Sequence, residues 1–377
     1  MIYLDHAATT PMRPQVWDAM RPYALDVFGN SSGVHAVSRR AKNALEESRE
    51  RVASLIGARP MEVVFTSGGT ESDNLAIKGA AWNDRLRSGV VTVTTEHEAV
   101  LETADVLKRF DDPVTLVSVD RDGFVSSQDI LEAIDESTAV VSVMLVNNET
   151  GLIQDIPAIS NAIKAEFPDV LVHTDAVQAY ASKDVKVSEL GVDMMTITGH
   201  KFGGPKGAGL LYVKEGTALE PVLHGGGQEL GRRSGTHDVA GVVGLSTAME
   251  LADRDRDRFN DEVGQARDEF ERLILKTVDG ALANTPSDHR STHHFNVRIP
   301  GVRNESLLMR LDQDGVAASP GSACQSGAAT VSHVLEGMGL TAEEARESLR
   351  FSFGWTSTMG EARDAAGVVR DLVEQLR

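Results

Sequence analysis

Cysteine is almost absent from this sequence, because Cys324 is the only one among 377 residues. An intramolecular disulfide is therefore excluded, and a cysteine-based metal cluster within one chain is not expected. Judged by composition alone, a single free cysteine is most often a small buried apolar residue. The alternative is an accessible reactive thiol, and the residues around Cys324 have to decide between the two.

Long apolar runs are missing as well, since no stretch approaches the roughly 20 apolar residues that span a membrane. Residues 1–6 contain no basic region followed by an apolar stretch, so we expect no signal peptide. Lysine is scarce: ten of the 37 basic residues are lysine, and the formal net charge is −19. Such acidity argues against nucleic acid as a partner. We therefore expect a soluble, cytoplasmic protein that binds neither membranes nor nucleic acid.

A pattern of metal ligands is also missing. The sequence has eleven histidines, and two of them, His293 and His294, are adjacent. This pair has no cysteine or acidic partners at the spacing that metal sites use. We therefore expect no metal site.

The first half of the chain alternates between short Val-rich segments and periodic helical segments. We predict strands at 62–66, 90–94, 114–119, 139–146, 170–174 and 193–198, and helices from 71 and at 100–110, 127–135 and 156–167. Most of these strands are apolar on both faces, which is typical of a parallel or mixed sheet covered by helices on both sides. In such α/β sheets, ligands bind beyond the carboxyl ends of the strands.

The length and the apolar content of 41% are sufficient for a large core and predict two domains. The charged run at 253–258 is expected to be helical, to face solvent and to lie near a domain junction. Beyond it, a long helix at 259–278 and a strand at 294–299 predict a smaller α+β domain. We expect a large domain at 13–255, and a small domain that joins 1–12 to 256–377 and carries Cys324.

Three of the predicted strands are followed by polar segments with more than one interpretation. The glycines of Ser67-Gly68-Gly69-Thr70 precede a helix, which suits a phosphate, although a simple turn capped by Thr70 or Ser67 fits equally well. His97 follows the next strand, and three interpretations fit it: a ring-stacking platform, an acid or base, or a surface residue. The amides of Asn147 and Asn148 follow another, where they either orient a ligand or form an Asx turn.

Two further strands end in residues with a more specific implication. Asp175 ends a buried strand, where a desolvated carboxylate needs a cationic partner. Lys201 ends the next strand, beside Thr198 and His200. A pyridoxal phosphate (PLP) enzyme requires an aspartate that pairs with the pyridinium nitrogen of the cofactor and a lysine that bonds to its aldehyde carbon. Each motif is weak alone, but five strand ends that together supply a phosphate cradle, a histidine, amides, an aspartate and a lysine predict a PLP site.

These motifs resemble those of the cysteine desulfurases of the NifS/IscS type, a class-V aminotransferase group within the fold-type I PLP enzymes. The resemblance covers nearly the whole chain. The matching segments are 3–11, 28–30, 65–74, 146–149, 198–201, 224–229, 233–236, 321–324 and 348–352. The resemblance implies a large domain with a mostly parallel, seven-stranded type of sheet flanked by helices, and a smaller α+β domain.

The resemblance also implies a role for each matching residue. Lys201 would form a Schiff base with PLP and later act as a base, while His97 would stack on the pyridine ring and move protons. The remaining cofactor contacts would be Asp175 at the ring nitrogen, Gln178 at the phenolic oxygen, and Gly69, Thr70, Thr198, His200 and the Thr236 of a second subunit at the phosphate. Asn148 and Arg350 would hold the substrate carboxylate, for which a planar guanidinium is well suited.

The segment around Cys324, residues 319–329, is small, polar and rich in glycine, which is typical of an exposed loop rather than a core. An accessible thiol there fits the nucleophile of the family. Gln325 stands where the family usually has threonine, and Pro320 where serine or glycine is common. Both departures are mild and leave the role of Cys324 intact.

The implied activity is removal of sulfur from L-cysteine, which leaves L-alanine and a persulfide on Cys324. A homodimer is implied, together with a sulfur acceptor such as an iron–sulfur scaffold or a tRNA-thiolation enzyme. The alternatives within the PLP enzymes are a selenocysteine lyase or another class-V aminotransferase-like enzyme. An inactive sulfur carrier or scaffold is a third alternative, and the retained Lys, Asp, His and Arg set speaks against it.

Overall fold

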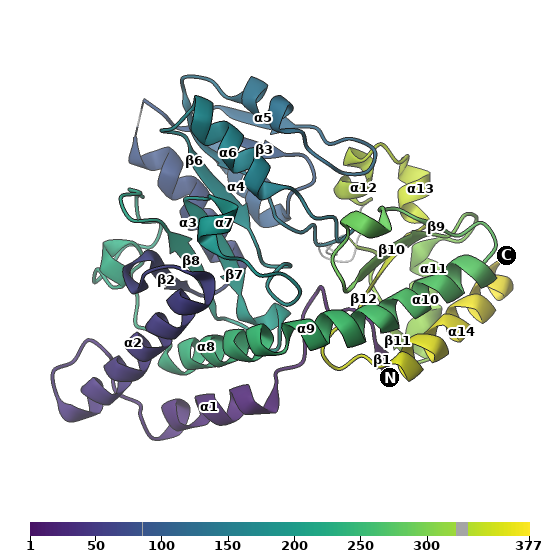
Figure 1. Cartoon of the computed structure of the whole chain (residues 1–377), viewed down its shortest axis with the longest axis horizontal. Coiled ribbons are helices and arrows are strands. Elements are labelled where there is room, and N and C mark those ends of the chain that lie inside the picture. The colour runs from purple at the N-terminus through teal and green to yellow at the C-terminus, as the bar shows by residue number, and fades with distance from the viewer. Residues whose placement is uncertain (85, 322–330) are drawn as a thin grey trace.

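The computed structural model describes residues 1–84, 86–321 and 331–377, which form two lobes (Figure 1). One lobe contains a seven-stranded sheet. Its strands, in spatial order, are β2 (Val63–Thr66), β8 (Gly209–Val213), β7 (Met194–Thr198), β6 (Leu171–Asp175), β5 (Thr138–Ser142), β3 (Gly89–Val93) and β4 (Val114–Val117). All neighbouring strands are parallel except that β8 is antiparallel to both β2 and β7. The predicted mostly parallel, helix-flanked sheet is therefore confirmed.

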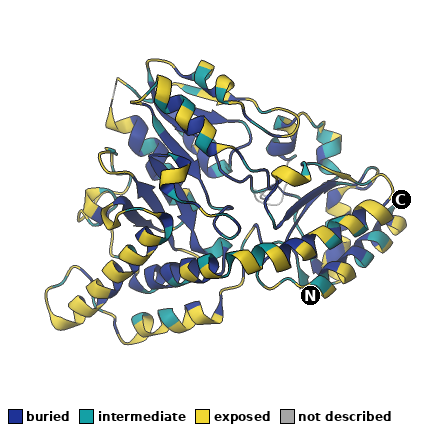
Figure 2. Ribbon diagram, in the orientation of Figure 1, coloured by how far each residue is buried: buried dark blue, intermediate teal, exposed yellow. Residues whose placement is uncertain are grey.

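Helices pack on this sheet and bury their inner faces, as Figure 2 shows. They are α2 (Ala36–Ile56), α3 (Gly69–Asn83), α4 (Glu98–Lys108), α5 (Ser127–Ala133), α6 (Ile156–Glu166), α7 (Val187–Leu190) and α8 (Val239–Arg254), with short 3₁₀ turns at Pro60–Glu62, Gly199–Lys201 and Glu229–Gly231. A further helix, α1 (Pro14–Leu25), packs on α8 (Figure 1). The predicted strand at 139–146 ends early, at Ser142, because residues 143–146 leave the ladder. Val146 instead pairs with Ile153 in an isolated bridge.

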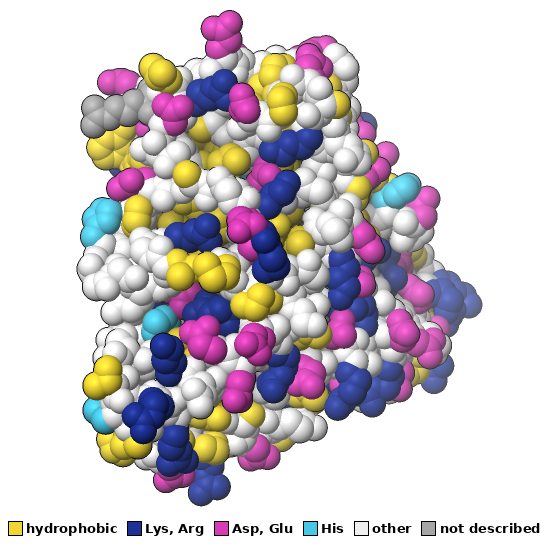
Figure 3. Space-filling view, turned by 60° about the vertical axis from the view of Figure 1, so that its left-hand side comes forward, with side chains coloured by type: hydrophobic (Ala, Val, Ile, Leu, Met, Phe, Trp, Pro, Cys, Tyr) yellow, Lys and Arg dark blue, Asp and Glu magenta, His cyan; other side chains and the backbone are white. Residues whose placement is uncertain are grey.

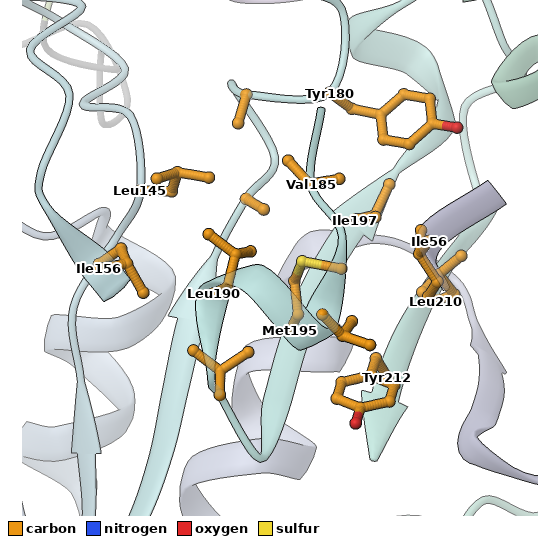
Figure 4. Close-up of a cluster of buried hydrophobic side chains, with 14 of the residues drawn as sticks. Ile56, Leu145, Ile156, Tyr180, Val185, Leu190, Met195, Ile197, Leu210 and Tyr212 are labelled. Atoms are coloured by element: carbon orange, nitrogen blue, oxygen red, sulfur yellow. The ribbon is translucent and has the colours of Figure 1, made fainter. Parts of the chain in front are cut away.

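Both faces of the sheet are apolar, as the strand sequences predict. Successive side chains of a strand point to opposite faces, and β7 accordingly places Met194 in one buried cluster and Met195 and Ile197 in another. Figure 4 shows part of the larger cluster, where Met195 and Ile197 lie beside Leu210 of β8 and close to Ile56 at the end of α2. The two covered faces fix the sheet between layers of helices and leave its carboxyl edge for a site.

The second lobe surrounds a three-stranded antiparallel sheet in the order β12, β10, β9. Its elements are β1 (Ile2–Tyr3), α10 (Gly264–Thr277), β9 (Leu282–Ala283), β10 (His294–Arg298), α11 (Asn304–Gln313), β11 (Val316–Ala317), α12 (His333–Gly337), α13 (Ala342–Arg346), β12 (Ser348–Ser352) and α14 (Met359–Leu376), with a 3₁₀ turn at Ser287–His289. β1 pairs with β11 in parallel. Both chain termini lie in this lobe (Figure 1).

A separate hydrophobic core fills the second lobe, and Leu4 belongs to it. Because Leu4 packs with residues of α10, β10, β12 and α14, these cores support the division into 13–255 and 1–12 with 256–377. We propose this division as the domain boundary.

The charged run at 253–258 is helical in part, and Arg254, Asp257 and Arg258 are exposed as expected, but Asp255 and Arg256 do not face solvent freely. α8 ends at Arg254, and a turn at Arg256–Arg258 (α9) and a π-helical turn at Phe259–Val263 lead into α10. The side chains of Asp255 and Arg256 are each only 14% exposed. Asp255 forms an ion pair with Arg13 at 2.7 Å, and the guanidinium of Arg256 lies over the ring of Tyr180. These contacts near the domain junction therefore partly cover a run that is expected to be fully solvated.

The surface in Figure 3 mixes Lys and Arg with Asp and Glu, and hydrophobic side chains lie among them. Among the described residues, no helix is long and apolar enough to cross a membrane.

The core of the second lobe predicts a stability effect. Phe270 of α10 is fully buried, and its ring contacts those of Phe295, Phe351 and Phe353 at centroid distances of 6.1, 4.8 and 5.6 Å. Phe270→Ala should lower the free energy of unfolding by about 3–5 kcal/mol, measured by urea denaturation. Phe110→Ala, at a side chain that is 65% exposed, is the control and should change it by less than about 1 kcal/mol. Equal losses in the two variants would contradict this packing.

Candidate active site

A cavity of about 220 Å³ lies at the carboxyl edge of the seven-stranded sheet. It is lined by Gly69, Thr70, Asp73, His97, Met144, Asn148, Asp175, Val177, Gln178, Thr198, His200 and Lys201. Nine of these residues are the predicted site residues from five strand ends, so the structure brings them together. Asp73, Met144 and Val177 were not expected. Of these, Asp73 carries a signal in the sequence, an acidic residue one helical turn after the glycines.

Three predicted residues are not among those lining the cavity. Thr236 is exposed at the surface of the single chain. Arg350 is buried in β12, and its Nη1 donates to the backbone oxygen of Asn148 at 2.7 Å, so it contacts the wall of the cavity. Cys324 lies outside the described residues.

The N-terminus of α3 opens toward the cavity without a side-chain cap. Its N-cap residue is Gly68, whose φ of 149° is a conformation that other residues rarely adopt. The alternative of a turn capped by Thr70 or Ser67 is therefore wrong. The uncapped N–H groups and the positive end of the helix dipole form an anion site, beside Thr198 and His200. This suits a phosphate group.

The loop that carries Thr236 is tied to the same region. Glu229 is buried and accepts hydrogen bonds from Arg49, at 2.8 and 2.7 Å, and from the backbone N–H of Phe65 in β2 at 2.9 Å. Burial raises the pKa of Glu229, but its bonds to Arg49 and His237 dominate and lower it to about 2. Glu229 therefore stays ionised, and it fixes this loop to the strand that precedes α3.

Buried carboxyl groups lie at one side of the cavity. Burial raises the pKa of Asp175 to about 6, against the opposing effects of the N–H of Val177 and of Lys201. Burial and the charge of Asp175 also raise the pKa values of Asp73 and Glu96. Within the described part of the chain, Asp73 Oδ1 and Glu96 Oε2 are buried without a hydrogen-bond partner. The cluster therefore favours a cationic ligand at Asp175.

His173, which lies close to this cluster, does not supply that cation. His173 Nε2 lies 3.7 Å from Asp73 Oδ1, but burial lowers the pKa of His173 to about 3. The ring is therefore neutral near pH 7 and hydrogen-bonds to Ser142 and Thr196.

Lys201 is held by backbone oxygens of the N-terminal segment. Its Nζ donates to the carbonyls of Ala7 at 2.6 Å and Ala8 at 3.0 Å. Burial, and then the charge of Arg350, lower the pKa of Lys201 to about 8, although Asp175 and Asp5 act in the opposite direction. A substantial fraction of this amine is therefore unprotonated at mildly alkaline pH, as a nucleophile or base requires.

His97 is held in one orientation as the N-cap of α4. Its Nδ1 accepts from the backbone N–H of Ala99 at 3.0 Å, so the proton of the neutral ring is assigned to Nε2. Burial, followed by the charges of Lys201 and His333, lowers its pKa to about 4. Of the three interpretations of His97, that of a surface residue is excluded, because the partly buried side chain lines the cavity.

The two adjacent asparagines have different environments. Asn147 Oδ1 accepts from the N–H groups of Glu149 and Thr150, both at 2.9 Å, which is an Asx-type turn. Asn148 lines the cavity, and its Oδ1 is buried without a partner in the described chain. The Asx turn is therefore confirmed for Asn147, whereas orientation of a ligand by Asn148 stays a prediction.

Comparison with known proteins assigns this chain to a family. The family model for class-V aminotransferases matches residues 2–363. The chain belongs to the class-V aminotransferase family. The cysteine desulfurase IscS of Dictyoglomus turgidum is 41% identical to this class-V protein over the whole chain and 95% of its own length.

Solved structures agree with this assignment. A NifS-like protein superimposes with a TM-score of 0.93 at 32% identity and covers 99% of both chains. SspA in complex with cysteine has a TM-score of 0.83 at 36% identity, over 94% of this chain and 99% of its own. The resemblance to NifS/IscS-type desulfurases and the fold-type I architecture are thereby confirmed.

Proteins of this class-V type depend on PLP, and the residues of this cavity fit that cofactor. The uncapped end of α3 matches its phosphate, the carboxyl cluster around Asp175 matches a protonated ring nitrogen, and Lys201 is an amine of lowered pKa for its aldehyde carbon. The buried Oδ1 of Asn148, which has no partner in the described chain, leaves one further acceptor for a hydrogen-bond donor of a ligand.

The lowered pKa of Lys201 predicts a pH dependence for attachment of PLP to cofactor-free protein. Only the unprotonated amine attacks an aldehyde, so the attachment rate should rise with pH up to about 8 and level off above it. The rate is measured by the change in cofactor absorbance over a pH series. A rate that keeps rising toward 10.5, the ordinary pKa of lysine, would contradict the assignment.

Proposed function

We propose that this chain is a cysteine desulfurase that converts L-cysteine to L-alanine and transfers the sulfur to Cys324. The observation that carries the proposal is the presence, in one cavity, of Lys201, Asp175 and the uncapped N-terminus of α3. A relative at 41% identity over the whole chain that carries the name cysteine desulfurase supports the same activity.

In this proposal, Asp175 would pair with the pyridine nitrogen of PLP, Gln178 with its phenolic oxygen and Lys201 with its aldehyde carbon. The phosphate would be held by Gly69, Thr70, Thr198 and His200. His97 would lie against the ring. When bound, PLP stores the electrons that the substrate α-carbon releases as it loses a proton.

The chain's own groups supply the binding and proton-transfer steps. Arg350 and Asn148 would orient the substrate carboxylate, and Lys201 Nζ would accept the α-proton. The lowered pKa of Lys201 supports this role because a base must be unprotonated to act. His97, neutral near pH 7, would move a second proton through Nε2.

Sulfur transfer requires the thiolate of Cys324. In the proposed step, the thiolate attacks the sulfur of the substrate, so that a sulfur–sulfur bond forms and the carbon–sulfur bond breaks. The electron pair of the broken bond stays with the carbon fragment, which takes up a proton and leaves as L-alanine. The persulfide on Cys324 would then pass its sulfur to an acceptor protein, such as an iron–sulfur scaffold or a tRNA-thiolation enzyme.

A homodimer completes the proposal. Thr236 is exposed and would reach the cofactor phosphate of the partner subunit. Several large apolar side chains near the ends of α1 and in the loops that follow are exposed, among them Leu25 at 63%, Phe28 at 76% and Val34 at 89%. Exposed apolar side chains of this size support an interface between subunits.

The nucleophile is tested with Cys324→Ser. This variant should bind PLP and L-cysteine with the usual absorbance changes, but sulfide release in the presence of a thiol reductant should fall by at least about 100-fold, because a hydroxyl is a poor sulfur acceptor. Lys201→Ala is the matched variant and should lose the cofactor absorbance itself. Sulfide release from L-cysteine at the normal rate would overturn the desulfurase mechanism, and activity retained on selenocysteine alone would favour a selenocysteine lyase.

The shared site is tested by mixing two inactive variants. Lys201→Ala and Thr236→Ala subunits should each form weak sites alone, because one lacks the amine and the other a phosphate contact. If Thr236 acts on the partner's cofactor, the mixed dimer contains one site with both native residues, so activity should reappear on mixing. No recovery in a dimer shown to be mixed by mass spectrometry would place Thr236 in the site of its own chain.

A further inference from the structure

Arg350, the proposed substrate-carboxylate residue, already has a carboxylate partner within the chain. Its Nη2 donates to Asp5 Oδ1 at 2.7 Å, and the side chains of Arg350 and Asp5 are 5% and 22% exposed. The two residues are 345 positions apart in the sequence. Asp5 therefore supplies the negative charge that pairs with the buried guanidinium of Arg350.

The remaining donors of Arg350 show what a substrate can bind. Nη1 is used by two backbone oxygens, of Asn148 at 2.7 Å and of Gly321 at 3.4 Å. Nε is buried and has no acceptor within the described residues. A carboxylate that binds the guanidinium in bidentate fashion uses two neighbouring N–H groups. With Nη1 engaged, the available pair is Nε and Nη2, and Asp5 occupies Nη2.

Asp5 is fixed in this position by its backbone. It forms a parallel bridge with Ser352 of β12, and the N–H of Ser352 donates to the carbonyl of Leu4 at 2.8 Å. The hydroxyl of Tyr3 donates to the carbonyl of Asp5 at 3.0 Å. The segment then crosses from β1 to α1 in the other lobe, as Figure 1 shows. Asp5 is thus anchored beside Arg350 and has little freedom to move away.

We propose that Asp5 is a positioning residue that competes with the substrate carboxylate for Arg350. In the free enzyme, Asp5 neutralises the buried guanidinium and holds its orientation. An incoming amino acid has to share Nη2 or displace Asp5 from it, so Asp5 limits the affinity for amino-acid substrates and products. The inference rests on the proposed role of Arg350 in binding the carboxylate.

The test measures binding of L-alanine, the proposed product, to the PLP-loaded enzyme. Asp5→Asn keeps the shape of the side chain and a hydrogen-bond acceptor but removes the competing charge. It should bind L-alanine about fivefold more tightly, because a hydrogen bond to a charged group is worth roughly 1 kcal/mol more than one to a neutral group. Affinity is read from the cofactor absorbance, and the KM for L-cysteine should fall in the same variant.

Three further variants separate the possible causes. Asp5→Ser is a second neutral variant and should also bind more tightly, while Asp5→Glu retains the charge and should not. Asp364→Asn removes one charge from an exposed position on α14 and should leave L-alanine affinity unchanged. These controls distinguish local competition from a change in net charge.

Each other outcome overturns the inference. Unchanged or weaker binding in both neutral variants makes Asp5 a structural anchor only, as does loss of PLP binding in both. The variant Arg350→Gln shows whether the proposed role of Arg350 or only the proposed role of Asp5 is wrong. If it binds L-alanine as well as the wild type does, the proposed role of Arg350 is wrong. If it binds poorly while the neutral Asp5 variants bind no more tightly, the competition by Asp5 alone is wrong.

Discussion

Two basic side chains, Lys201 and Arg350, lie close together at the site, where burial and then the charge of Arg350 lower the pKa of the lysine. The first eight residues contact both of them. Ala7 and Ala8 offer backbone oxygens to Lys201, and Asp5 offers a carboxylate to Arg350. An unpaired charge in a protein interior costs several kcal/mol, so these contacts are a condition for placing both cations at one site. The N-terminal segment therefore determines the geometry on which binding and proton transfer depend.

Burial has opposite effects on the acids and bases of this site. It raises the pKa of Asp175 to about 6 and lowers that of Lys201 to about 8. The same desolvation therefore brings the pKa values of an acid and a base toward neutral pH from opposite directions, which makes the charge of Asp175 depend on a cationic partner and leaves Lys201 able to act as a base. Burial and the charge of Asp175 raise the pKa values of Asp73 and Glu96 and favour their neutral forms, so the negative charge of the cluster is concentrated on Asp175, where it favours a protonated ring nitrogen.

Much of the fold could be predicted from the sequence, because strands that are apolar on both faces have few alternatives to a covered parallel sheet. The strand ends then placed Lys201, Asp175, His97 and Asn148 on one edge. The pairing of Asp5 with Arg350 could not be found in this way, since no periodicity links residues so far apart. Likewise, the run at 253–258 carries no sign that Arg13 and Tyr180 would bury part of it.

The central claim is that sulfur moves from L-cysteine to Cys324. The most direct measurement is mass spectrometry of the PLP-loaded protein after one addition of L-cysteine without reductant or acceptor. The account predicts that the peptide containing Cys324 gains one sulfur atom and that an equal amount of L-alanine is released. L-alanine without added sulfur on that peptide, or release of pyruvate in its place, would contradict it.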